Sequence, residues 1–136
     1  MFAEAVDHPK NVLVVEDDDD VRQFVVTVLS RQGYRTVESA SGIDALVHTQ
    51  PHRPKIDVLV TDISLLDTDG IALAEHFAGL FPEAGVVIMS GLAGIPRSRL
   101  EGLAVPWAFV EKPFHLQKLI DAVRSVLDEA GRVRAA

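Results

Sequence analysis

The sequence predicts an α/β fold, a parallel β-sheet with helices on both of its faces. Five short apolar segments that are typical of buried strands alternate with segments in which apolar residues recur at helical spacing. Crossover helices of this kind connect parallel strands. The chain has 136 residues, of which 48% are hydrophobic, which is enough for one core and too short for two. We therefore expect a single domain.

The predicted strands are residues 12–15, 35–38, 57–61, 86–89 and 107–110. Two helices are expected in the first half of the chain. The first follows the acidic run at residues 16–20 and stops at Gly33, because glycine is common just past helix ends. The second begins at Ser41, whose spacing to Asp44 resembles a capping box, and it ends before Pro51.

Three further helices are expected in the second half. Apolar spacing predicts one over residues 70–80. Glycine and proline confine the next to about 97–103, and we expect mobility over 92–104. The last helix begins near Leu116, carries the clearest apolar face and is expected to stop at Gly131.

Composition excludes several classes of function. The formal net charge of -7 argues against a nucleic-acid partner, whose phosphates this surface would repel. The chain has no cysteine, which excludes disulfides and thiolate metal sites. No apolar stretch approaches the length of a membrane span, so we expect no membrane association and a cytoplasmic protein.

Chemically active side chains follow four of the predicted strands. Glu16 and Asp17 follow the first, Asp62 the third and Ser90 the fourth, while Lys112 comes just after the fifth. Open parallel sheets bind ligands at the carboxyl ends of their strands. Stacked carboxylates are tolerable there mainly when a divalent cation is present, so the sequence predicts a metal site. For the acids of the run other than Asp17, a solvated helix start remains the alternative.

These residues stand in motifs that together resemble the receiver domain of two-component response regulators. The motifs are VLVVED at 12–17, VTD at 60–62, DG at 69–70, IMSG at 88–91 and EKPF at 111–114. The resemblance implies a flavodoxin-like, doubly wound sheet with strand order 2-1-3-4-5. It also implies a division of the chain into a flexible N-terminal segment, a receiver domain and a C-terminal tail, over residues 1–10, 11–130 and 131–136.

The resemblance assigns roles to the strand-end residues. Asp62 would be the phosphoacceptor, supplied by a histidine kinase or a histidine phosphotransfer protein. Mg²⁺ or Mn²⁺ would be held by Glu16, Asp17, Asp62 and the backbone carbonyl of Ser64, a set that suits the oxygen preference of Mg²⁺. Lys112 would stabilise the phosphoryl group. Such a protein catalyses only its own phosphorylation and dephosphorylation, so we do not expect an enzyme.

Signal output is implied by two further positions. Ser90 and Phe109 match the hydroxyl and aromatic switch of the family, through which phosphorylation biases a two-state equilibrium. A changed face would then bind a downstream protein, and the chain is expected to be a monomer or weak homodimer. Phe109 as an ordinary core aromatic stays open. The Lys112-Pro113 bond is expected to be cis, and Leu65-Leu66, where the family usually has Met-Pro, predicts altered mobility of that loop.

Alternative functions remain. The chain could be a phosphate sink or shuttle without conformational output. Because no effector domain follows the last helix, it resembles either a free-standing regulator of the chemotaxis type or a receiver excised from a hybrid histidine kinase. A small aspartate-nucleophile phosphatase would also use a strand-end Asp, Mg²⁺ and a Lys, and multiple turnover would reveal it.

Overall fold

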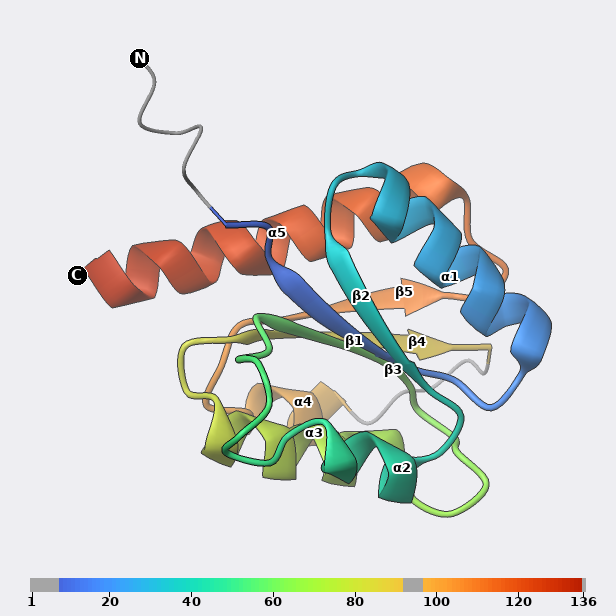
Figure 1. The fold of residues 1–136 in the computed structure, drawn as a ribbon, viewed down its shortest axis with the longest axis horizontal. Helices are drawn as coiled ribbons and strands as arrows, with labels where there is room; N and C mark the ends of the chain where they lie inside the picture. The colour runs from blue at the N-terminus through green and yellow to red at the C-terminus, as the bar shows by residue number, and fades with distance from the viewer. Residues whose placement is uncertain (1–7, 92–96, 136) are drawn as a thin grey trace.

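Five parallel strands form the centre of the structure, a computed structural model that describes residues 8–91 and 97–135 (Figure 1). The strands pair in the order β2-β1-β3-β4-β5, and helices cover both faces of the sheet. The predicted fold class, strand order and flavodoxin-like topology are therefore confirmed.

The strands are β1 (Asn11–Val15), β2 (Arg35–Ser39), β3 (Val58–Asp62), β4 (Gly85–Ser90) and β5 (Trp107–Glu111). The helices are α1 (Asp19–Arg31), α2 (Gly42–Val47), α3 (Gly70–Leu80), α4 (Arg97–Glu101) and α5 (Leu116–Ala135). Every strand end lies within one residue of its predicted position. Helix α4 is shorter than predicted and ends at Glu101.

Two hydrophobic cores lie on opposite faces of the sheet. Helices α1 and α5 cover one face, and α2, α3 and α4 cover the other (Figure 1). Side chains alternate along β1, so that Val12 and Val14 belong to the core under α1 and α5, while Leu13 and Val15 belong to the opposite one. Because central strands are buried on both faces, they read as continuous apolar runs in the sequence.

Two of the predicted helix boundaries are confirmed. Gly33 follows α1 with a φ of 97°, a left-handed conformation that glycine adopts without steric cost. The hydroxyl of Ser41 accepts the backbone N–H of Asp44 at 3.0 Å and caps α2.

The predicted helix end at Gly131 is wrong. Helix α5 runs from Leu116 through Ala135, so residues 131–135 continue the helix instead of forming a tail. A glycine inside a helix costs only about 1 kcal/mol relative to alanine. Arg132 pairs with Glu129 at 2.7 Å across this glycine, a contact three residues apart that supports the helix.

The loop between β3 and α3 is held by hydrogen bonds, although Leu65-Leu66 stand in place of the usual Met-Pro pair. The N–H of the first leucine donates to the carbonyl of Thr68 at 3.1 Å. The carboxylate of Asp67 accepts the N–H groups of Gly42 at 2.9 Å and Ile43 at 2.8 Å. These backbone hydrogen bonds from the start of α2 lower the pKa of Asp67. The loop is thereby anchored to α2.

Some predictions fall on residues outside the description. Residues 1–7 of the flexible segment predicted over 1–10 lie outside the described residues, and so do residues 92–96 of the segment 92–104 for which we expect mobility. Lys10, within the predicted flexible segment, is described, and its carbonyl accepts the N–H of Arg35 at 2.9 Å. None of the helices in the described ranges is long and apolar enough to cross a membrane.

Candidate functional site

Three carboxylates meet at the carboxyl ends of β1 and β3. Glu16 and Asp17 follow β1 directly, and Asp62 is the last residue of β3. Because β1 and β3 are neighbours, with Val15 paired to Thr61, one carboxylate oxygen from each of the three acids lies within 4.8 Å of the others. The structure thus brings together the three acids that the sequence predicted as metal ligands.

The ammonium group of Lys112 lies between two of these acids. Its Nζ is 2.7 Å from Oε1 of Glu16 and 3.5 Å from Oδ2 of Asp62. The backbone N–H of Lys112 donates to the carbonyl of Ser90 at 2.7 Å, which fixes the start of its loop against β4. The peptide bond between Lys112 and Pro113 is cis, as the resemblance implied.

Burial and charge oppose each other in this cluster. Glu16 is only 1% exposed, and desolvation raises its pKa against the hydrogen bonds from Lys112 and from the N–H of Asp18. Burial likewise raises the pKa of Asp62, more than Lys112 lowers it. Desolvation alone would lower the pKa of Lys112, but its contacts with Glu16 and Asp62 raise it. One ammonium faces three carboxylates, so the cluster favours a further cation.

The remaining predicted residues surround this cluster. Ser90 is fully buried at the end of β4, one residue beyond Met89, which pairs with Asp62. Phe109 pairs with Ile88, is partly buried, and packs against the core that includes Ile88. Since side chains alternate along a strand, Ser90 shares the face of Ile88, on which Phe109 also packs. Ser64 is exposed in the loop after β3 and forms an isolated bridge with Asp69.

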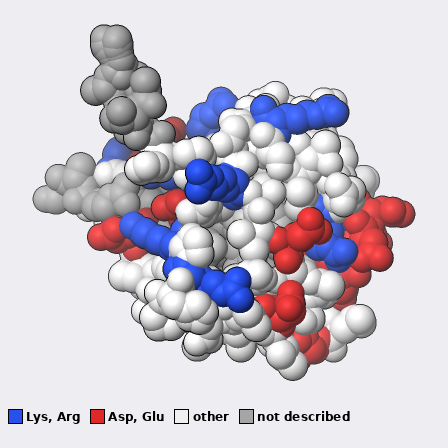
Figure 2. Space-filling view, viewed as in Figure 1, with Lys and Arg blue, Asp and Glu red and all other residues white. Residues whose placement is uncertain are grey.

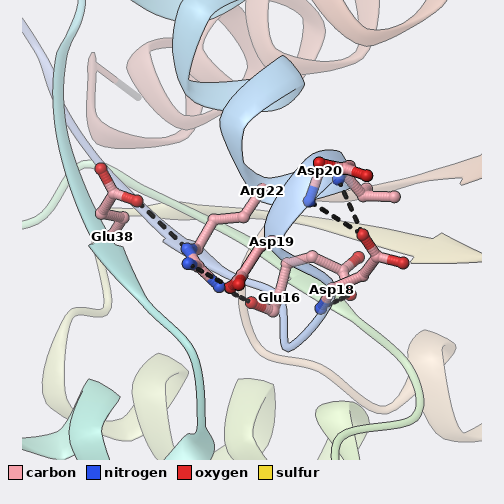
Figure 3. Close-up of polar contacts among 7 residues, drawn as sticks. Glu16, Asp18, Asp19, Asp20, Arg22 and Glu38 are labelled. Carbon is pink, nitrogen blue, oxygen red and sulfur yellow. Dashed lines mark hydrogen bonds and ion pairs between the residues drawn. The ribbon is translucent and has the colours of Figure 1, made fainter.

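The other acids of the run at residues 16–20 serve the start of α1. The Oδ1 atom of Asp18 accepts the N–H groups of Asp20 at 2.9 Å and Val21 at 3.1 Å, which is an N-cap (Figure 3). Asp19 pairs with Arg22 at 2.7 Å. In Figure 2, acidic side chains gather on the right edge of the molecule, where α1 begins in Figure 1.

Two arginines to which the sequence assigned no role make contacts with residues of the strand-end loops and α3. The guanidinium of Arg22 donates to the backbone carbonyl of Glu16 at 2.8 Å. Arg99 of α4 lies 2.5 Å from Asp69, the N-cap of α3, and 3.6 Å from Glu75. The position of Arg22, two residues after a run of acids, is a sequence signal for its contacts with that run. No sequence signal identifies the contact of Arg99 with Asp69.

A groove opens next to Lys112, with a volume of about 550 Å³. It is mostly apolar, and the rings of Phe24 from α1 and Phe114 from the loop after β5 lie 6.1 Å apart within it. Its lining residues are Asp20, Val21, Phe24, Gly91, Lys112, Pro113 and Phe114. Phe24 is 41% exposed, and together with Phe114 it gives the groove a solvent-accessible apolar wall.

Comparison with known proteins finds similarity to response regulator receiver proteins. The family model for the response regulator receiver domain matches residues 12–124. The response regulator receiver protein CpdR of Brucella abortus (strain 2308) is 29% identical over 118 residues, which cover 87% of this chain and 97% of that protein. The sensor kinase CckA of the same organism is 31% identical over 118 residues, covering 87% of this chain but 12% of the kinase.

Solved structures agree on the fold. A CheY-like response regulator receiver domain protein from Methanospirillum hungatei JF-1 superposes with a TM-score of 0.81 at 24% sequence identity. The alignment covers 92% of this chain and 98% of that one.

Proposed function

We propose that this chain, which belongs to the response regulator receiver domain family of two-component systems, accepts a phosphoryl group on Asp62 and signals through a changed protein-binding face. The observation that carries the proposal is the cluster of three carboxylates and one ammonium at the carboxyl end of the sheet. Asp62 is the acceptor because its side chain is 13% exposed, whereas that of Glu16 is 1% exposed and committed to Lys112.

The donor set fits Mg²⁺ or Mn²⁺. These ions take oxygen ligands, and Mg²⁺ usually binds one or two carboxylates, waters and a phosphate oxygen. Glu16, Asp17, Asp62 and the backbone carbonyl of Ser64 would hold the ion. When bound, it neutralises charge on the oxygens of the transferred phosphoryl group.

The transfer follows from the chain's own groups. A carboxylate oxygen of Asp62 attacks the phosphorus of a phosphohistidine, so that an O–P bond forms as the P–N bond breaks and the imidazole leaves with the electron pair. Lys112, 3.5 Å from the Asp62 carboxylate, stabilises negative charge on the phosphoryl oxygens. The reaction stops at an aspartyl phosphate on the protein itself, so the chain is not an enzyme for other substrates.

The phosphodonor docks in the groove beside Lys112. The groove shares Lys112 with the carboxylate cluster, so a protein seated there brings its phosphohistidine to Asp62. The exposed ring of Phe24 and the neighbouring Phe114 give this surface the apolar centre that protein partners bind. A histidine kinase or a histidine phosphotransfer protein is the partner class, which agrees with the match to a sensor kinase.

Output passes through Ser90 and Phe109. A phosphoryl group on Asp62 attracts the hydroxyl of Ser90, whose strand neighbour Met89 pairs with Asp62. A charge-assisted hydrogen bond contributes about 1.5–3 kcal/mol, which shifts a two-state population by about tenfold or more. Phe109 packs on the same face and moves with Ser90, so the surface of α4, β5 and α5 changes. Without such a change the protein would act as a phosphate sink or shuttle.

Metal binding is expected to depend on Asp17 more than on its acidic neighbours. Asp17→Asn should weaken Mg²⁺ binding by about tenfold or more, since losses of that size follow even from changes outside the direct ligands. Asp20→Asn should have a smaller effect, because this exposed side chain lies in the first turn of α1. Isothermal titration calorimetry measures this. Trp107 fluorescence is unsuitable, because Trp107 begins β5 at the opposite end of the sheet. An equal loss of Mg²⁺ affinity in Asp17→Asn and Asp20→Asn would contradict the assignment.

Phosphotransfer tests the proposed function. Purified histidine kinases, autophosphorylated with labelled ATP, are mixed with the chain and Mg²⁺. A cognate kinase should transfer one phosphoryl group per chain to the wild type, and none to Asp62→Asn. Repeated turnover of a small phosphate ester by the chain alone would favour the phosphatase alternative instead.

A further inference from the structure

We propose that Arg22 is a positioning residue for the metal site, acting through the backbone that joins Glu16 to Asp17. The proposal rests on the proposed function, because it gives Arg22 a task in building the cation site of the phosphoacceptor. Arg22 touches neither the metal site's carboxylates nor the phosphoacceptor. It acts on the chain that carries two of them.

The guanidinium of Arg22 has three hydrogen-bond partners, one in its own helix α1, one on β2 and one just after β1 (Figure 3). Its Nη1 donates to the carbonyl oxygen of Glu16, the residue that follows β1, at 2.8 Å. Its Nη2 donates to Asp19 at 2.7 Å on α1, and its Nε donates to Glu38 at 3.1 Å on β2. The side chain is only 16% exposed despite its charge, so these contacts replace most of its solvent.

The hydrogen bond from Arg22 to Glu16 fixes the peptide unit that joins two proposed metal ligands. The carbonyl that Arg22 binds belongs to the planar peptide unit between Glu16 and Asp17, so it orients the main chain at both residues. Strand β1 ends at Val15, and the last hydrogen bond that continues its pairing with β2 is from the N–H of Glu16 to the carbonyl of Ser39 at 3.1 Å. Pairing between strands therefore does not orient the carbonyl of Glu16. The hydrogen bond from Arg22 therefore extends the order of the sheet to the first residues of the loop.

Asp19 and Glu38 hold the guanidinium in place for this task. They lie on opposite sides of it, one on α1 and one on β2, as Figure 3 shows. A planar guanidinium offers donors in fixed and divergent directions, whereas a lysine ammonium is a single point charge on a flexible stem. Lysine would keep the charge at this position but could not reproduce the three contacts.

An electrostatic role and a positioning role of Arg22 predict opposite changes in Mg²⁺ affinity when Arg22 is replaced. If Arg22 acts only as a charge, its removal takes a repelling cation away from the metal site, and Mg²⁺ binds more tightly. If Arg22 positions the peptide unit between Glu16 and Asp17, its removal loosens two ligand residues, and Mg²⁺ binds more weakly. The sign of the change decides between them.

Mg²⁺ titration of the whole chain by calorimetry tests the proposal with four variants. Arg22→Gln and Arg22→Lys should each weaken binding by about tenfold, a loss typical of residues that orient metal ligands. Arg31→Gln removes the same charge from the exposed far end of α1, and Val28→Ala destabilises the core under the same helix. Both controls should bind Mg²⁺ within about twofold of wild type, since neither touches the loop.

A second readout needs no metal. In metal-free protein, the amide hydrogens of residues 16–20 should exchange faster in Arg22→Gln than in Val28→Ala, even where urea unfolding shows equal stability. Unchanged or tighter Mg²⁺ binding in Arg22→Gln, or wild-type binding in Arg22→Lys, would overturn the positioning role. If the wild type itself binds no Mg²⁺, the proposed function fails at its metal site, which is a separate and recognisable result.

Discussion

Asp62→Asn is expected to abolish phosphoryl acceptance while leaving the chain folded. Incubation with acetyl phosphate and Mg²⁺ should add one phosphoryl group to the wild type, because the carboxylate of Asp62 is the proposed nucleophile beside Lys112. The amide of asparagine has almost the same shape but is not nucleophilic. Intact-protein mass spectrometry measures the added group directly.

The fold should tolerate this substitution. Burial raises the pKa of Asp62, which means that the folded state disfavours its charged form relative to the unfolded chain. Above the raised pKa the ionised carboxylate therefore lowers stability, and this loss shrinks as the pH falls and is gone below the ordinary pKa of an aspartate in the unfolded chain. A neutral amide should leave stability at neutral pH equal or higher. Asp20→Asn, an exposed acid near the site, serves as the control and should be labelled normally. Wild-type labelling of Asp62→Asn would refute the assignment.

Gly70→Ala is expected to destabilise the protein strongly and to impair the acceptor site. A methyl group at Gly70 would lie 1.9 Å from the carbonyl oxygen of Asp62 and 2.9 Å from Cα of Ile63. Both are backbone atoms, and the N–H of Gly70 bonds to the carbonyl of Ile63 at 2.7 Å, so the loop cannot shift without losing that contact. Overpacking typically costs about 1–3 kcal/mol, and because the 1.9 Å approach is to backbone we expect a loss of about 3 kcal/mol.

The same helix offers a matched control. A methyl group at Gly79 meets no atom within 4 Å, and this residue is exposed on α3. Gly79→Ala should therefore raise stability by up to about 1 kcal/mol, because alanine is the better helix former. Urea unfolding at equilibrium compares both variants with wild type. A Gly70→Ala variant within about 1 kcal/mol of wild type would show that the loop is not tightly packed against β3.

The fold could be predicted because its central strands are continuous apolar segments in the sequence. The strands β1, β3 and β4 are buried on both faces, so their apolar runs have sharp ends. In a parallel sheet all carboxyl ends lie at one edge, so the residue after each run identifies the site. The sequence alone therefore predicts that Glu16, Asp17, Asp62 and Ser90 lie at this edge.

Other features depend on contacts that no local pattern encodes. A glycine in the sequence does not by itself show where a helix ends. Gly33 follows the end of α1 in a left-handed conformation, whereas Gly131 lies inside α5. The contact of Arg22 with Glu38 spans 16 residues and requires that β2 lie beside β1. The ion pair of Arg99 with Asp69 spans 30 residues and depends on where α4 sits above the sheet.

A phosphoryl group on Asp62 is expected to change the face made by α4, β5 and α5. Hydrogen exchange of the wild-type chain with Mg²⁺ tests this, in the presence and absence of beryllium fluoride as a phosphoryl mimic. We expect altered protection at residues 97–101, 107–111 and along α5, in addition to the site itself. Changes confined to the surroundings of Asp17 and Asp62 would contradict coupled output and leave a phosphate sink or shuttle.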